Sequence, residues 1–91
     1  MKKTAIDLIK EEREKQITKY GYTTTHDRNY PNGTVLRGAL AYLNAAIYSG
    51  PVGEEDWPFD KNFFNSEGEL KDLVKAAAMI VAEIDKKLEE S

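Results

Sequence analysis

Three stretches of the chain repeat apolar residues with the spacing of an α-helix, at about residues 4–20, 34–49 and 67–89. A recurrence every three or four residues places those side chains on one face of a helix, where they can pack on a core. The stretches between them lack that period. We therefore predict an all-α fold of three main helices, which form one helical domain over residues 1–91.

The first and third helices have start or stop signals in their own sequence. Thr4 suits the N-cap of the first helix, Asp7 suits the positive end of its dipole, and Gly21 stands where a C-cap glycine belongs. The third helix is expected to begin near Ser66, because Ser66 and Glu69 have the spacing of a capping box.

The apolar stripe of the first helix continues onto polar residues. Ile6 and Ile9 mark its buried side. Arg13 and Gln16 follow at the same spacing, where leucine would be expected, and Glu12 lies beside them. A guanidinium with a neighbouring amide can hold a phosphate or a carboxylate. The alternative is an ion pair between Arg13 and an acidic residue of the loop or of another subunit, because buried charges are usually paired.

The second and third helices are apolar around most of their circumference. Ten of the twelve residues from 73 to 84 are apolar. The second helix has two adjoining apolar lines, which are Leu36, Leu40, Leu43, Ile47 and Val35, Ala39, Tyr42, Ala46. Such helices need cover on most sides, and the other elements of one chain do not supply it. We expect the two helices to pack together and a second subunit to cover the rest, most simply in a two-fold homodimer.

The two connecting segments differ in character. Residues 21–33 are rich in Thr, Asn, Asp, Gly and Pro, which predicts an irregular loop and leaves room for a short strand. Residues 50–66, which we call the aromatic strap, contain glycine and proline but also Trp57, Phe59, Phe63 and Phe64. A disordered linker is poor in aromatic residues. We therefore predict that the strap is ordered and packs across the helices.

Composition and charge exclude several kinds of function. The 91 residues carry 13 Lys and Arg against 16 Asp and Glu, which disfavours a protein that holds a nucleic-acid polymer through its phosphates. Without cysteine and with one histidine, the chain has no thiol nucleophile and no Cys or multi-His metal site, so we assign no metal and no cofactor. No apolar run has the length of a signal peptide or a membrane span, so we expect a cytoplasmic protein with no membrane partner.

His26 and Asp27 are adjacent in the predicted loop. Adjacent loop residues aim at one point only in a special turn, and the His-Asp pair of metal-dependent phosphohydrolases requires further metal ligands. The alternative is structural, with Asp27 closing a turn or capping a helix and His26 bonded to the backbone. The pair is therefore a candidate for ligand contact rather than a catalytic dyad by itself.

Three further side chains are candidates because of their surroundings. Lys75 and Glu83 interrupt the apolar stretch of the third helix at positions about 80° apart around its axis, so they face adjacent sides. A lysine there pairs with a carboxylate, extends to the surface or holds an anionic ligand. Trp57 of the aromatic strap stacks on a nucleobase in one interpretation and pins the strap to the core in the other.

Short motifs lie along nearly the whole chain. They are Glu12-Arg13-x-x-Gln16, Gly21-Tyr22-Thr23 with His26-Asp27, Trp57-Pro58-Phe59, and Leu73-Val74-Lys75-Ala76 with Ala82-Glu83-Ile84. Together they resemble the motifs of a family of small proteins spread through phages and prophages. Arg28 and Asp72 depart from that family's pattern. The resemblance implies a phage-type origin and no particular reaction.

The leading hypothesis is a non-enzymatic, phage-type accessory protein that binds a small anionic ligand, such as a nucleotide or a nucleotide-derived signal of host defence. Arg13 and Lys75 would hold the phosphate. Gln16 and Asp27 would contact the base or sugar, and Trp57 would cover the ring. The candidate ligand-binding residues are Glu12, Arg13, Gln16, His26, Asp27, Trp57, Lys75 and Glu83. The alternatives are a module that docks on a host or phage protein through the acidic aromatic strap, and a small nucleotide hydrolase with His26 as base.

Overall fold

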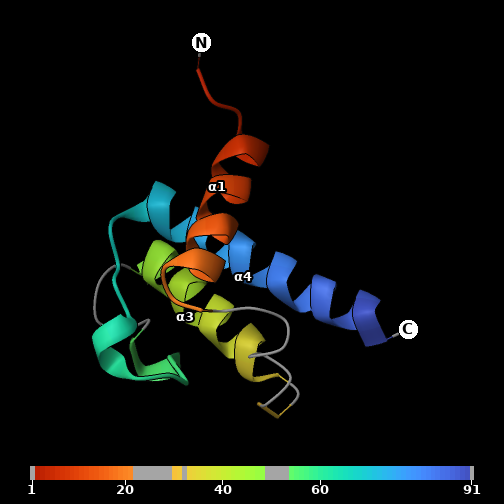
Figure 1. Cartoon of the computed structure of the whole chain (residues 1–91). Helices are drawn as coiled ribbons and strands as arrows, with labels where there is room; N and C mark the ends of the chain where they lie inside the picture. The colour runs from red at the N-terminus through yellow and green to blue at the C-terminus, as the bar shows by residue number, and fades with distance from the viewer. Residues whose placement is uncertain (1, 22–29, 32, 49–53, 91) are drawn as a thin grey trace.

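The computed structural model describes residues 2–21, 30–31, 33–48 and 54–90. Within these ranges the chain is helical and contains no β-strand. Its elements are α1 (Ala5–Thr18), α3 (Thr34–Tyr48), the 3-10 helix η2 (Lys61–Phe63) and α4 (Glu69–Glu90) (Figure 1). The prediction of three main helices is confirmed, with ends shifted by one or two residues. The predicted loop at residues 21–33 lies mostly outside the described residues.

The capping residues of α1 act as its sequence predicts. The Thr4 hydroxyl accepts a hydrogen bond from the Asp7 backbone N–H at 3.2 Å, and the Asp7 carboxylate accepts one from the Thr4 backbone N–H at 3.0 Å. These hydrogen bonds lower the pKa of the Asp7 carboxyl below its ordinary value. At the other end, Gly21 has φ of 71° and its N–H donates to the carbonyl of Ile17. Glycine adopts this left-handed conformation without the strain of a side chain.

The start of α4 differs from the expected capping box. The helix begins at Glu69, and the Ser66 hydroxyl donates instead to Asp72, at 2.6 Å. The second oxygen of Asp72 accepts from the Glu67 backbone N–H at 2.9 Å. Asp72 is only 1% exposed. A single buried carboxylate therefore holds Ser66 and Glu67, three and two residues before the helix, because each of its oxygens accepts one hydrogen bond.

The central element of the fold is α4. Figure 1 shows α3 running alongside it and α1 crossing it, while the C-terminal part of α4 extends beyond both. The core consists of Val35, Ala39, Ala41, Tyr42, Ala76, Met79 and Ala82, together with Trp57 of the aromatic strap. The many alanines on both helices allow the axes of α3 and α4 to approach closely, because the distance between packed helices depends on the side chains at the contact.

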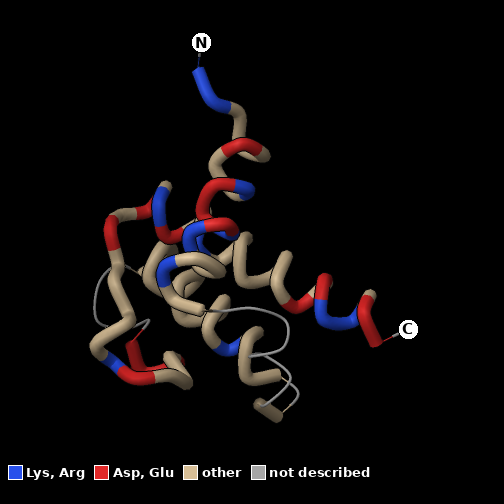
Figure 2. The backbone as a smooth tube through the Cα atoms, in the orientation of Figure 1, with Lys and Arg blue, Asp and Glu red and all other residues tan. Residues whose placement is uncertain are grey.

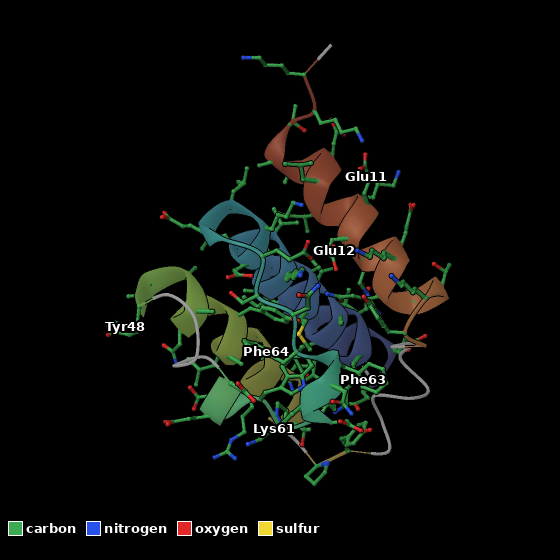
Figure 3. The ribbon with its side chains drawn as sticks, turned by 90° about the vertical axis from the view of Figure 1, so that its left-hand side faces the viewer. Glu11, Glu12, Tyr48, Lys61, Phe63 and Phe64 are labelled. Carbon is green, nitrogen blue, oxygen red and sulfur yellow. The ribbon has the colours of Figure 1, made fainter. Side chains whose placement is uncertain are left out.

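The described part of the aromatic strap is ordered and packed, as predicted. The ring of Tyr42 on α3 stacks on Phe64 with centroids 4.8 Å apart and meets Trp57 edge-on at 5.2 Å. The Tyr42 hydroxyl also accepts a hydrogen bond from the backbone N–H of Asn65. Phe63 is the exception, because more than half of its side chain is exposed, whereas Phe64 packs against the core (Figure 3). The strap is thus attached to α3 by ring contacts and a hydrogen bond.

Part of the surface that the sequence predicts to be buried is exposed. On α3, Val35, Ala39 and Tyr42 are buried. Each residue of the adjoining apolar row is more than one third exposed, and these residues are Leu36, Leu40, Leu43 and Ile47. On α1, Ile6 is 72% exposed. The reason is geometric, since α4 and the strap cover α3 on one side only and the start of α1 extends beyond α4 (Figure 1).

Substituting Gly38 by valine tests the close packing of α3 on α4. A Cβ at this buried glycine would stand 2.5 Å from Met79 Cε and 3.2 Å from Phe59 Cε2. We expect the free energy of unfolding to fall by about 1–3 kcal/mol, because the added atoms overpack the core. Urea denaturation followed by circular dichroism measures the change.

The neighbouring exposed residue offers a matched control. Arg37→Val introduces the same β-branched side chain on α3 without contacting the core, so it should cost less than about 1 kcal/mol. Equal losses in the two variants would contradict the close packing at Gly38.

Candidate functional site

Four of the eight candidate ligand-binding residues line one small cavity between α1, α4 and the strap. They are Glu12, Gln16, Trp57 and Lys75. The cavity volume is about 20 Å³. A space of that size accommodates roughly one water molecule and is far below the volume of a nucleotide site. The helices therefore bring these residues together as the sequence suggests, but around a cavity of water-molecule size.

Lys75 is engaged within the chain. It is 6% exposed, and its ammonium group donates hydrogen bonds to the Glu67 carboxylate and to the backbone carbonyl of Asn65. Its Nζ also lies 5.3 Å from the centroid of the Tyr42 ring, within range of a cation–π contact. Hydrogen bonding and the positive charge of Lys75 lower the pKa of the Glu67 carboxyl below its ordinary value. This contact joins α4 to the end of the strap and corresponds to the pairing alternative for Lys75.

Arg13 and Gln16 are both buried, as the continued stripe of α1 predicts. The Nε atom of Arg13 lies 3.9 Å from a carboxylate oxygen of Asp85 on α4. One acidic neighbour of Arg13 thus belongs to α4. The side-chain oxygen of Gln16 is buried without a hydrogen-bond partner among the described residues. A water molecule in the small cavity that Gln16 lines would satisfy this oxygen.

Glu83 is also buried, at 4% exposure, yet it lines none of the cavities that contain Lys75. One of its carboxylate oxygens lies 3.2 Å from Lys87 Nζ, one turn further along α4. Within the described part of the chain neither oxygen has a hydrogen bond of good geometry. His26 and Asp27 lie outside the described residues. The structure therefore separates Glu83 from Lys75, in agreement with their predicted positions on adjacent sides of the helix.

The inner side of α4 holds charged residues as well as core residues, while its opposite side is apolar and exposed. Four charged residues face inward and are buried, namely Asp72, Lys75, Glu83 and Lys86. The opposite side, an arc of about 120° at 3.6 residues per turn, contains no charged residue from 69 to 88. Its members are Leu70, Leu73, Val74, Ala77, Ile80, Val81, Ile84 and Leu88. Five of these are among the exposed large hydrophobic residues of the chain.

We call the outward-facing apolar residues of α3 and α4 the α3–α4 face; eight of them are large exposed side chains, and Ala77 is half-buried. The residues of this face are Leu36, Leu40, Leu43, Ile47, Leu73, Ala77, Ile80, Ile84 and Leu88. A groove of about 380 Å³ runs between the two helices, with Ala39, Ala76 and Ala77 among its lining residues. Figure 2 shows that charges cluster on α1, on the strap and at the two ends of α4, while α3 and the middle of α4 are almost free of them. Sequence reasoning anticipated uncovered apolar surface on these two helices but did not locate it on particular residues.

A second groove, of about 320 Å³, lies between α1 and the start of α4. Leu8, Leu70 and Val74 form its apolar part. Its charged residues are Glu11, Glu12, Glu67, Lys15, Lys71 and Lys75, so positive and negative charges balance. Figure 3 shows Glu11 and Glu12 on the side of α1 that passes over α4.

Comparison of the chain with known protein families, with curated proteins and with solved structures finds no match. In the part of the chain that the structure describes, no helix has the length and apolar content needed to cross a membrane. In the same part, no three acidic or histidine side chains are grouped so that they could hold a metal ion.

Replacing Lys75 by methionine tests its contact with the strap. The variant keeps the apolar stem but loses both hydrogen bonds of the ammonium group, so we expect the free energy of unfolding at neutral pH to fall by about 1–3 kcal/mol. Lys71→Met is the matched control, because Lys71 is exposed and lies 3.5 Å from the same carboxylate; it should cost about 0.5 kcal/mol or less. Equal costs in urea denaturation would contradict the assigned contact.

The same pair of variants predicts a difference in pH dependence. Because the pKa of folded Glu67 lies below the ordinary value of 4.5, its stabilising contribution is present above that value and is lost as the pH falls through the folded pKa. We expect wild-type protein and Lys71→Met to lose stability over this acidic range. Lys75→Met should lose less there, since the main cause of the lowered pKa is gone. Urea denaturation at a series of acidic pH values measures the difference.

Proposed function

We propose that the protein is a non-enzymatic interaction module that assembles as a homodimer through the α3–α4 face. The observation that carries the proposal is that α4 buries four charged residues on its inner side while five large apolar residues on its opposite side are exposed. Burying charged groups is costly, and exposing several large apolar side chains is costly as well. A single folded chain bears both costs, whereas a partner on the α3–α4 face removes the second.

The size of the face supports a stable interface. The exposed parts of its leucine and isoleucine side chains amount to roughly 700 Å², close to the 800 Å² or so that each partner buries in a standard interface. The largest apolar patch of a typical monomer is about 300–600 Å². The exposed areas of these eight side chains thus add up to somewhat more than the largest apolar patch of a typical monomer.

A second copy of the chain is the occupant that the chemistry favours. The face carries no charge that would demand a complementary partner, and it has both ridges of leucine and a groove lined by alanine. In a two-fold interface the same patch serves both partners, so a ridge of each copy can fill the groove of the other. The acidic strap is less suited to docking, because Trp57, Phe59 and Phe64 pack on the core of their own chain.

Binding of a small anionic ligand, such as a nucleotide, is a second candidate function. It is favoured by the groove between α1 and α4, whose volume of about 320 Å³ is at the lower end for ligand sites. Lys15 and Lys71 would contact the anion, since Lys75 is already bonded to Glu67. The three glutamates of the same groove oppose a highly charged ligand.

Sedimentation analysis of charge substitutions tests the homodimer. Wild-type protein should be dimeric at micromolar concentration. Ile80→Asp should raise the dissociation constant at least about 100-fold, equivalent to ~2.7 kcal/mol, because it places a carboxylate in an apolar interface. Ile80 is exposed in the single chain, so the variant should keep its helical circular dichroism.

Ile6→Asp is the matched control for this experiment. Ile6 is the more exposed isoleucine and lies on α1, away from the α3–α4 face, so the variant should stay dimeric. Wild-type protein that remains monomeric near 0.1 mM, about 100-fold above the micromolar range expected for the dimer, would contradict the proposal.

Calorimetric titration tests the second candidate. Mono-, di- and cyclic nucleotides should release heat at tens of micromolar, and Lys15→Gln should weaken binding about tenfold, equivalent to ~1.4 kcal/mol. Lys2→Gln, at an exposed position before α1 and outside the groove, should leave binding unchanged. Absence of heat with every nucleotide would remove this candidate.

A further inference from the structure

Five apolar residues of α4 are spaced almost symmetrically about Ile80. Leu73 and Ala77 lie 7 and 3 residues before it, and Ile84 and Leu88 lie 4 and 8 residues after it, whereas the exposed Leu70, 10 residues before it, has no apolar counterpart. Suppose that two copies of this helix run antiparallel about a two-fold axis beside Ile80. A residue of one copy then faces the residue of the other copy for which the two residue numbers add up to about 161. In this arrangement the apolar residues of one α4 helix face apolar residues of the other.

The residue sizes in this pairing are complementary. Leu73 of one copy faces Leu88 of the other, and Ala77 faces Ile84. A small residue opposite a large one lets two helices interdigitate without a void, which is the packing that protein interiors show. In a parallel arrangement Ala77 would face Ala77, and a gap would remain between the bulkier pairs on either side of it. The antiparallel arrangement also places opposite ends of the helix dipoles beside each other.

From this pattern we infer that the two copies associate with their α4 helices antiparallel, about a two-fold axis beside Ile80. The inference rests on the proposed homodimer and specifies its geometry. It also accounts for the C-terminal part of α4, which extends beyond α1 and α3 (Figure 1). Ile84 is 52% and Leu88 67% exposed there. In the antiparallel dimer the N-terminal half of the partner's α4 covers them, and the same contact is made twice.

Single-cysteine variants test the pairing, because the chain has no cysteine of its own. Ile80→Cys should form a covalent dimer with a short bismaleimide, since position 80 lies beside the axis and meets its own copy. Leu73→Cys and Leu88→Cys should each give little product alone. Co-expression of these two variants should give the covalent heterodimer in high yield, because positions 73 and 88 face each other.

A control and a second pair strengthen the experiment. Ile6→Cys, on an exposed part of α1, should give no covalent dimer under the same conditions. Ala77→Cys with Ile84→Cys should repeat the result of the first pair. Circular dichroism of each variant before cross-linking shows that its helices are intact.

The outcomes separate this inference from the proposal on which it rests. A sedimentation dimer in which Leu73→Cys and Leu88→Cys each cross-link to their own copy would show a parallel pair, which overturns the inference and leaves the homodimer standing. A dimer in which none of these positions cross-links would indicate an interface formed by α3, and this result would also overturn the inference. A protein that sediments as a monomer would contradict both the homodimer and its antiparallel geometry. A monomer that co-sediments with phospholipid vesicles would contradict both as well.

Discussion

The inward-facing charges of α4 are the constraint on which the rest of the structure depends. Asp72 accepts hydrogen bonds from Ser66 and Glu67 in the segment before the helix, and Lys75 donates to Glu67 and to Asn65. Asn65 is held in turn by the hydroxyl of Tyr42 on α3. A buried charge that loses its partner costs several kcal/mol. The end of the strap is therefore held where its polar groups bond the buried charges of α4. Tyr42 connects α3 to the same end of the strap.

The same constraint creates the α3–α4 face. Because the buried charges of α4 are needed inside, the large apolar residues of its opposite side face outward, and no helix within the described residues covers them. The interior that remains is built largely from alanines and from the aromatic rings of the strap. Anchoring of the strap and exposure of the apolar face thus have one physical cause, the orientation of a single helix.

This orientation also changes the balance between the functional hypotheses. A cation that binds an external anion must be able to leave its internal partners, and Lys75 has a carboxylate, a carbonyl and an aromatic ring around it. Arg13 has Asp85 nearby. Trp57 donates its indole N–H to the carbonyl of Asp60 and packs on Tyr42. The side chains that motivated a nucleotide site therefore have structural contacts, whereas the large apolar side chains of the α3–α4 face are exposed.

The sequence by itself determined the three helices, the cap at Thr4 and Asp7, the stop at Gly21 and the order of the aromatic strap. These features depend on residues within a few positions of one another or on composition. It also identified Arg13, Gln16, Lys75 and Glu83 as polar groups in buried places. Only the tertiary structure decided which side of α4 faces inward. A helix that is apolar over most of its circumference fits a core in more than one orientation, and hydrogen-bond partners in the preceding segment select among them.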